Sequence, residues 1–532
     1  MVRRVQRGEA SRRETRPASS KRVELERGQR LSRSVLWQLQ RAFFEQRGLT
    51  AWSEEVVPHY ITNNPRIASA YAHVVREFIR YTSTDKRLYI VELGVGSGRF
   101  GYRFLNTLHA LLEDHPAPFD SFTYVMTDIS ERTLQALQSH PYLQPFIRNG
   151  SLDFARFDAE QPEPLCLRIG GKTLDTRGPT VVFANYVFDS LPQDCFAIRD
   201  HELHECLVTT RATAPVSDPF DPGLLERVRL SFVDRPIEAE TYYPIEAHNA
   251  VLDSYRGNPD GVFLFPTAAF ATLDYFKSLG SSDLLILSAD KGFHRIEEIR
   301  GLAHPRLTLH GSFSFAVNYH GLGEYARARE AHVLEPQHSP TGLRIVAYVW
   351  GAPAAPIRVA YQEFIENGGP DDFYAVKKAL EPFYSRLDLS QLLGFVRFSG
   401  FDSDILLACA PTIHKVVANA STLERADLID VLERVWNTYL PLAGGDGADL
   451  AFEIGTLLFK LDEADRALVY FQRSREWWGL DAATAYNAAL CLKRLGDRDT
   501  ALRSVEEALQ LQPEFELASI LRDELLGVTA PR

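Results

Sequence analysis

Three acids, each at or near the end of a short apolar run, have the clearest chemical potential in the sequence. Glu92 lies in LYIVEL (88–93), Asp128 in TYVMTDI (123–129) and Asp158 at the end of FARFD (154–158). The first run leads into VELGVGSGRFG, whose alternate glycines are Gly94, Gly96 and Gly98. Glycines in a strand-to-helix turn let backbone amides and a ligand approach each other without an intervening Cβ atom. The pattern therefore predicts a nucleotide-like ligand at such a turn.

Glu92 indicates which ligand this is, because the glycine spacing fits both a dinucleotide loop and an S-adenosylmethionine (SAM) loop. A carboxylate just before the glycines would repel a pyrophosphate. SAM has no phosphate and carries an ammonium and a sulfonium, so an acid suits it. We expect Asp128 to accept the ribose hydroxyls and Asp158 to lie near the adenine amino group. A helix N-cap or a solvated turn is the alternative for each acid alone. Together the three acids favour SAM over nicotinamide or flavin.

The elements that must position these acids alternate between strand and helix. Further strand-like runs are TVVFAN (180–185), LLILSAD (284–290) and LRIVAYVWG (343–351), with helical periodicity between them. This alternation predicts an α/β fold with a parallel, doubly wound, Rossmann-like sheet and functional loops at the carboxyl ends of its strands. The predicted units are a disordered basic tail (1–34), a sheet domain (35–355) with N-terminal helices and an inserted cap at about 195–265, a helical region (356–440) and a repeat region (441–532).

The last of these units carries an internal repeat. Gly455 aligns with Ala489, Leu461 with Leu495 and Ala467 with Ala501, each pair 34 residues apart. That period, with small residues where two helices touch, resembles the tetratricopeptide repeat. We expect an all-α helical-repeat domain that binds a protein substrate or partner; a generic helical tail is the alternative.

Four stretches resemble the MidA-like family of class I SAM-dependent methyltransferases. They are HYITNNPRIASAYAHVV (59–75), VELGVGSGRF (91–100), ANYVFDSLP (184–192) and the segment from SADKGF to HGSFSFAVNYHGL (288–322). The resemblance covers about residues 55–350 and implies methyl transfer to nitrogen, with some members methylating an arginine of a partner protein. By position, Glu92 and the three glycines take the cofactor-loop roles, and Asp128 and Asp158 take the ribose and adenine roles.

The same resemblance places Asn185, Asp189 and Pro192 nearest the transferred methyl group, and it matches Asp290 to the aspartate of a D-Y-G motif. The sequence also departs from the family. Tyr186 stands where the family has an acid, and Asn318 stands where it has a histidine. A carboxylate could hold a guanidinium with two parallel hydrogen bonds. Its loss leaves cofactor binding intact and puts an arginine acceptor in question.

Methyl transfer requires a deprotonated, desolvated nucleophile aligned with the S–CH3 bond. Asp189 is the candidate base or orienting group, and Asn185 and Tyr186 are candidate hydrogen-bonding groups beside it. Loop capping ahead of Leu191-Pro192 is the structural alternative for Asn185 and Asp189. The predicted catalytic set is therefore Asp189, Asn185 and Tyr186.

Composition and charge exclude several other classes. Residues 1–34 hold eleven lysines and arginines against four glutamates, a net charge of +7. Because the whole chain carries −12, the remaining residues carry −19. This balance argues against a nucleic-acid partner for the body of the protein. We find no apolar stretch of membrane-spanning length. A less favoured interpretation of the basic tail is an organellar transit peptide.

The five cysteines are widely spaced and form no C-x-x-C pair, which indicates a reducing cytoplasm and argues against a cysteine zinc site. The run His201-Glu202-Leu203-His204-Glu205 has metal-ligand residue types in the wrong spacing, so no metal is predicted. Two functional alternatives stay open beside a protein methyltransferase. One is a catalytically silent scaffold on the methyltransferase fold, and the other is a small-molecule N- or O-methyltransferase whose repeats serve self-assembly.

Overall fold

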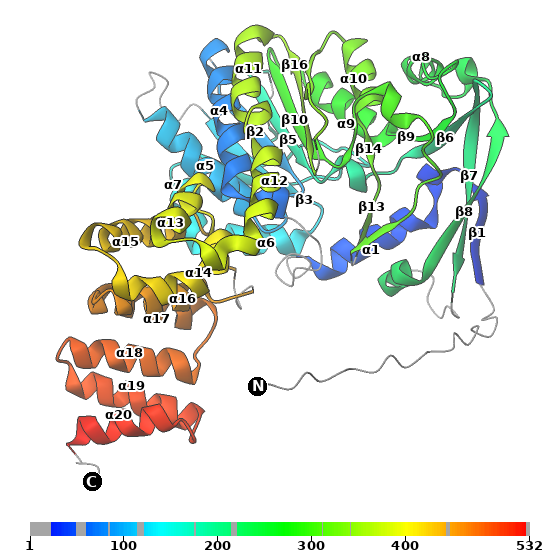
Figure 1. Ribbon diagram of the computed structural model, residues 1–532. Helices are drawn as coiled ribbons and strands as arrows, with labels where there is room; N and C mark the ends of the chain where they lie inside the picture. Colours follow the sequence, from blue (N-terminus) through cyan, green and yellow to red (C-terminus); the bar gives the residue numbers. More distant parts are fainter. Residues whose placement is uncertain are drawn as a thin grey trace.

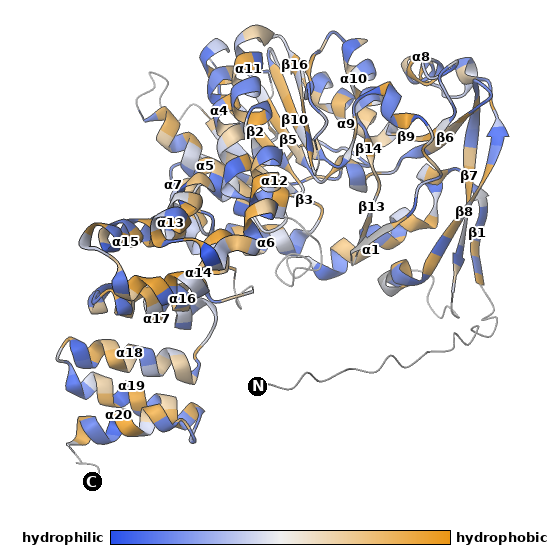
Figure 2. Cartoon of the chain, in the orientation of Figure 1, coloured by the Kyte–Doolittle hydropathy of each residue, from blue (hydrophilic) through white to orange (hydrophobic). Residues whose placement is uncertain are grey.

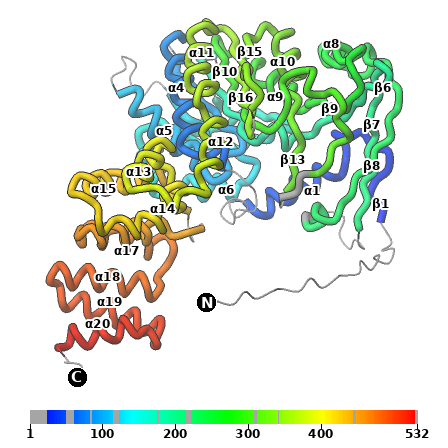
Figure 3. Tube along the Cα trace, viewed as in Figure 1, coloured from blue at the N-terminus to red at the C-terminus, as the bar shows by residue number. Residues whose placement is uncertain are grey.

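The computed structural model describes residues 23–48, 60–82, 86–113, 122–174, 177–213, 221–310, 312–340, 342–442 and 447–527. The molecule has a central sheet domain with a second sheet beside it (Figure 1). A stack of helices projects from the central sheet domain. The C-terminal helices lead away from the sheets and end at the far tip of this stack (Figure 3). The predicted α/β fold with a following all-α region is confirmed.

The central sheet has seven strands in the order β15-β16-β10-β5-β2-β3-β4. Five strands are parallel, whereas β16 is antiparallel to β10 and β15 is antiparallel to β16. Their bounds are β2 (Leu88–Leu93), β3 (Phe122–Asp128), β4 (Leu152–Arg156), β5 (Thr180–Asn185), β10 (Leu284–Asp290), β15 (His332–Leu334) and β16 (Arg344–Trp350). Each of the six predicted runs overlaps one of these strands. The order of connection reverses between β2 and β5, where open α/β sheets bind their ligands.

Both faces of this sheet are covered by helices because its strands are apolar on both sides (Figure 2). Along β2, Ile90 packs into one hydrophobic cluster and its neighbour Val91 into another. The first cluster includes helices α4 (Pro65–Tyr81) and α5 (Arg99–Leu112), and the second includes α9 (Thr267–Ser278) and α10 (Tyr319–Arg327). This is the doubly wound arrangement that the sequence predicts.

The predicted cap region forms a second, antiparallel sheet. Its strands are β1 (Val23–Gln29), β6 (Asp194–Arg199), β7 (Glu202–Ala212), β8 (Val228–Pro236) and β9 (Gly261–Phe265). Helix α1 (Val35–Arg47) packs on it through Leu36, Leu39 and Phe43, and lies between the two sheets (Figure 1).

The prediction of a disordered tail over 1–34 is wrong for residues 23–33, and residues 1–22 lie outside the described part. Strand β1 pairs with β7, and Leu31–Arg33 forms a 3-10 turn. The segment VELERGQ is mostly exposed and charged, so its composition carries no apolar strand signal. It is held by the backbone ladder and by Glu26, whose carboxylate accepts hydrogen bonds from Thr210 Oγ1 at 2.7 Å and from the Val35 amide at 2.9 Å.

The helical part begins after the sheet and ends in antiparallel pairs. Its α-helices are α11 (Ala354–Tyr361), α12 (Pro370–Leu380), α13 (Leu389–Phe398), α14 (Ser403–Val416), α15 (Thr422–Asn437), α16 (Leu450–Lys460), α17 (Ala464–Trp477), α18 (Ala482–Arg494), α19 (Arg498–Leu511) and α20 (Glu516–Leu526). Helices α16 with α17 and α18 with α19 occupy the two units of the predicted repeat. In each unit a small residue, Gly455 or Ala489, is buried between the helices.

The last residue of α15 and the linker after it join the helical stack to the sheet domain. Arg99 donates to Leu440 O at 3.1 Å, Tyr102 Oη donates to Asn437 O at 3.2 Å, and Arg103 Nε donates to Thr438 O at 3.1 Å. These three donors are on the first turn and a half of α5, directly after the glycine loop. The stack is therefore attached next to the predicted cofactor loop.

Gly455 provides a stability test of the repeat packing. A Cβ atom there would lie 3.0 Å from the Phe471 ring, so Gly455→Leu overpacks the contact between α16 and α17. We expect a loss of about 1–3 kcal/mol in the free energy of unfolding, measured by urea denaturation.

Gly394→Leu is the matched control. Gly394 is also helical, but the nearest atom to its added Cβ is 4.0 Å away. We expect it to be neutral or to stabilise by up to about 1 kcal/mol through helix propensity. Equal losses in both variants would contradict the packing described here.

Candidate functional site

The glycine loop lies between β2 and α5, as predicted. Gly94, Gly96 and Gly98 have φ angles of 63°, 53° and 75°, in the left-handed region that favours glycine. A Cβ atom at Gly98 would lie 2.7 Å from Leu137 Cδ2. The loop thus turns in a conformation that side chains would resist, and it brings backbone close to the carboxyl end of β3.

Glu92 is buried beneath this loop. Its Oε2 atom accepts a hydrogen bond from Tyr124 Oη at 2.8 Å. A Cβ atom at Gly101 would lie 2.8 Å from the same Oε2, so the glycine on α5 gives the carboxyl its space. Burial raises the pKa of Glu92 to about 8, despite the opposing hydrogen bond from Tyr124. The group is therefore mostly neutral at pH 7 until a cation approaches it.

Asp128 ends β3 and is held by backbone amides. It accepts from Ser130 N at 2.8 Å and from Gly96 N at 3.3 Å. Burial raises its pKa to about 6, even though these hydrogen bonds favour the charged form. The second contact ties the acid to the glycine loop, so the two predicted cofactor elements lie together.

Asp158, two residues beyond β4, is paired with a residue that the sequence analysis did not single out. Arg41 Nη2 of α1 lies 2.6 Å from Asp158 Oδ2, and Asp158 Oδ1 accepts from Glu160 N at 3.0 Å. Helix α1 therefore crosses the end of the sheet at the third predicted acid. Its amphipathic pattern indicated a helix but gave no sign of where the polar face would lie.

A cavity opens at this edge of the central sheet between α1 and the strand ends. Its walls come from α1, the β2 loop, the ends of β3 and β4, and the segment after β5. The polar residues that line it include Gln40, Arg41, Asp128, Ser130, Asp158, Asn185 and Ser190. Phe44, Ile129, Phe157, Val187 and Leu191 are among its apolar residues. An apolar slot with acids at its edge suits a nucleoside.

A second cavity lies on the other side of the glycine loop. Leu93, Gly94, Asn185 and Tyr186 line both cavities, and Thr62, Asn63, Glu92 and Ser97 line the second. Asn63 Oδ1 and Asn185 Nδ2 are buried there without a hydrogen-bond partner. Unpaired buried amide atoms are costly, so this pair of an acceptor and a donor fits a zwitterionic ligand group.

Asn185 and Tyr186 form the boundary between the two cavities. Tyr71 Oη donates to Asn185 Oδ1 at 2.9 Å, which fixes the amide. Tyr186 has a φ angle of 53°, a strained conformation for a residue with a large side chain. Its amide donates to Ala289 O at 2.9 Å, which holds the strained turn in place.

Asp189 lies behind this boundary rather than in either cavity. It is buried, and it is hydrogen bonded to Ser190 Oγ at 2.9 Å and to the carboxyl of Asp290. Burial raises the pKa of Asp189 to about 6 and that of Asp290 well above its ordinary value. Asp189 is not among the described residues that line either cavity. The negative charge of Asp189 adds to burial in raising the pKa of Asp290 within the wall of the site.

Asn318, the second departure from the family pattern, is a buried structural residue. Its Oδ1 accepts from Gly321 N at 2.8 Å at the start of α10, and its Nδ2 donates to Leu264 O at 2.9 Å. Its hydrogen bonds therefore link α10 to β9 of the second sheet. The residue does not line either of the two cavities in the described part of the chain.

A family model matches the part of the chain that holds most of this site. Residues 70–265 match the model of a family described as "Putative S-adenosyl-L-methionine-dependent methyltransferase". This range contains the glycine loop and the six predicted acid, amide and phenol side chains. The predictions of a SAM-dependent methyltransferase and of SAM as its cofactor are confirmed at the level of this family. No curated protein matches the chain.

Several solved structures resemble the chain. An uncharacterized protein from Burkholderia thailandensis is 16% identical, with 62% of this chain and 89% of that chain covered and a TM-score of 0.40. A protein of the same superfamily and organism, bound to S-adenosyl-homocysteine, is 16% identical, with 60% and 94% covered and a TM-score of 0.37. YrrB, a tetratricopeptide-repeat protein with an unusual peptide-binding site, is 19% identical, with 32% and 81% covered and a TM-score of 0.24.

The raised pKa of Glu92 gives a pH test of the site. A folded-state pKa of about 8, against an ordinary value of 4.5, means that folding takes up a proton between these values. The free energy of unfolding should therefore fall as pH rises through this window, by on the order of a few kcal/mol. We expect Glu92→Gln, which keeps an acceptor for Tyr124, to flatten this fall between pH 6 and pH 8.

Urea denaturation at several pH values measures the effect. Glu131→Gln is the control, because Glu131 is an exposed acid whose pKa is lowered chiefly by its hydrogen bond with Arg168. The control should keep the wild-type slope above pH 6. An unchanged slope in Glu92→Gln would contradict the burial of a neutral carboxyl beneath the glycine loop.

Proposed function

We propose that this protein binds SAM across the two cavities and transfers the methyl group to a side-chain nitrogen of a protein. The observation that carries the proposal is the boundary formed by Asn185 and Tyr186, which line both cavities. The adenosine part is assigned to the cavity beneath α1, and the amino-acid part to the cavity beside Asn63. The reactive methyl group then lies at the boundary, where an acceptor could meet it.

The residues present fit this cofactor. Asp128 supplies a carboxylate for the ribose hydroxyls, and Asn63 Oδ1 supplies a free acceptor for the ammonium. Glu92 lines the same cavity, so an ammonium bound there would stabilise the charged form of its carboxyl. One carboxylate oxygen of Asp158 is paired with Arg41. We therefore assign recognition of the adenine edge to Asp158 together with the adjacent backbone. When bound, SAM supplies an electrophilic methyl group.

The residues of this chain would align and desolvate the acceptor. We assign direct contact with the acceptor nitrogen to Asn185 and Tyr186. Asp189 keeps the orienting role and not that of a contacting base, because it is buried behind the boundary and paired with Asp290. Tyr186 offers one hydroxyl where an acid would offer two oxygens, which favours a single amine or amide nitrogen over a bidentate guanidinium.

A macromolecular acceptor is favoured by the helical stack. Its helix pairs resemble units that bind peptides, and they are attached beside the glycine loop through Arg99, Tyr102 and Arg103. An acceptor protein held by the stack would thus be presented close to the cofactor. The alternative of a silent scaffold is favoured by one observation, the replacement of the family's acid by Tyr186.

Asp128→Asn tests the cofactor assignment. Loss of charged hydrogen bonds to the ribose should weaken S-adenosylhomocysteine binding by roughly 10- to 100-fold, as measured by titration calorimetry. Asp427→Asn is the matched control, since Asp427 pairs with Arg397 on the surface of the helical stack. Equal affinities of the wild type and Asp128→Asn would refute the ribose assignment.

Tyr186→Phe tests the acceptor side. Because its hydroxyl is assigned to the acceptor alone, we expect the variant to lose most methyl transfer, by about 100-fold or more, while its affinity for S-adenosylhomocysteine changes little. Cell lysate incubated with the protein and methyl-labelled SAM gives the readout, separated into protein and low-molecular-weight fractions. Label in small molecules alone would favour a metabolite methyltransferase. Cofactor binding without any labelled product would favour the scaffold.

A further inference from the structure

Three polar side chains form a row across the second sheet. Cys206 on β7 pairs with Asp234 on β8. On its other side, the ladder that joins Phe196 to Glu205 places Cys195 of β6 next to Cys206. Directly opposed residues in antiparallel strands present their side chains on one face of the sheet. The Cys206 thiol accordingly interacts with both Cys195 and Asp234.

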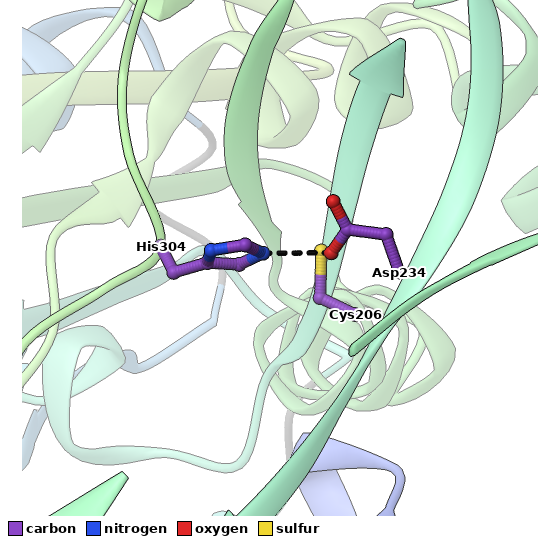
Figure 4. A group of neighbouring side chains, drawn as sticks. All are labelled: Cys206, Asp234 and His304. Atoms are coloured by element: carbon purple, nitrogen blue, oxygen red, sulfur yellow. Dashed lines mark hydrogen bonds and ion pairs between the residues drawn. The ribbon is translucent and has the colours of Figure 1, made fainter. Parts of the chain in front are cut away.

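A histidine from another segment completes this row. His304 Nε2 lies 2.7 Å from Asp234 Oδ1 (Figure 4). The imidazole ring is stacked on Phe232, with ring centroids 5.0 Å apart and planes within 2°. The chain leading to it is fixed to β9, because Val262 N donates to Leu302 O at 3.0 Å. The histidine is therefore positioned by packing and by backbone.

The second carboxylate oxygen of Asp234, Oδ2, is paired with the guanidinium of an arginine. Arg199 Nε and Nη2 lie 2.9 Å and 2.7 Å from Asp234 Oδ2. The carboxylate is thus oriented by a neighbour outside the row, and its Oδ1 atom faces His304. Metal-binding carboxylates are commonly oriented by such partners.

We propose that Cys206, Asp234 and His304, with Cys195 as the fourth ligand, bind a zinc ion. The ligand atoms of the first three lie within 4.8 Å of one another. Tetrahedral zinc with bonds of about 2.0–2.3 Å places its ligands roughly 3.3–3.8 Å apart, so these three require only small side-chain movements. Cys195 lies outside this group of three, and its side chain would have to turn toward the ion to complete the coordination. The inference concerns the second sheet and is independent of the proposed methyl transfer.

Charge and chemistry favour zinc over harder cations. Two thiolates, one carboxylate and the Arg199 guanidinium together balance the two charges of the ion. Sulfur and imidazole ligands select zinc, whereas magnesium and calcium prefer oxygen.

Access to the row is from the side of Asp234 and His304. Their side chains are 19% and 34% exposed, whereas both cysteines are fully buried. Four protein ligands would close the coordination sphere, which is typical of a structural zinc site. The ion would join β6, β7 and β8 to the segment that carries His304.

Cobalt(II) substitution of the full-length protein tests the site. After chelation and dialysis, we expect one Co2+ per chain with a sulfur-to-cobalt charge-transfer absorption, displaced by one Zn2+. Titration calorimetry of Zn2+ binding should give one site per chain. Cys206→Ala should abolish the charge-transfer band, and His304→Gln should weaken Zn2+ binding at least tenfold.

Cys409→Ala is the matched control, because Cys409 is a buried thiol of the helical stack. It should keep the stoichiometry and the spectrum of the wild type. If Cys206→Ala does not fold, His304→Gln and the wild-type spectrum still test the proposal. Because His304 is partly exposed, we expect its replacement to leave the fold intact. Absence of stoichiometric Co2+ and Zn2+ binding by the reduced wild type would overturn the proposal. A disulfide between Cys195 and Cys206 that persists in mild reductant would also overturn it.

Discussion

The parallel pairing of β2 with β3 on one side and β5 on the other is the constraint on which the site depends. It brings the carboxyl ends of three strands to one edge of the sheet. Residues far apart in sequence, such as Gly96 and Asp128, become hydrogen-bonded neighbours there. The apolar faces of these strands, buried under helices on both sides, supply the free energy that keeps this edge in register.

That same burial changes the chemistry of the acids at the edge. Glu92, Asp128, Asp189 and Asp290 all have raised pKa values, with desolvation as the principal cause. A cluster of four ionised carboxylates in so small a volume would be strongly destabilising. Burial holds them as neutral or partly charged groups, against hydrogen bonds from Tyr124 and from backbone amides that favour the charged forms. A cationic ligand is the natural complement of such an environment.

Much of the sheet domain could be predicted from sequence because its strands are continuous apolar runs such as LLILSAD, and because its glycines stand in a fixed order. The pairing of Arg41 with Asp158 could not, since the polar face of an isolated amphipathic helix does not reveal what it will contact. Strand β1 was missed because it is held by backbone hydrogen bonds and not by burial. The approach of His304 to Cys206 depends on strand register across the second sheet, which no local spacing encodes.

The attachment of the helical stack limits where this chain can be divided into separate parts. Arg103 is buried at the joint, and its guanidinium donates to Asn63 O of the second cavity as well as to Thr438 O of the linker. A cut within residues 437–441 would leave that guanidinium without one of its acceptors, next to the wall of the site. The two parts are thus not interchangeable modules joined by a tether. A related chain that lacked the helical stack, or carried another domain in its place, would need a different residue at position 103. That change would also alter the part of the second cavity that Asn63 lines.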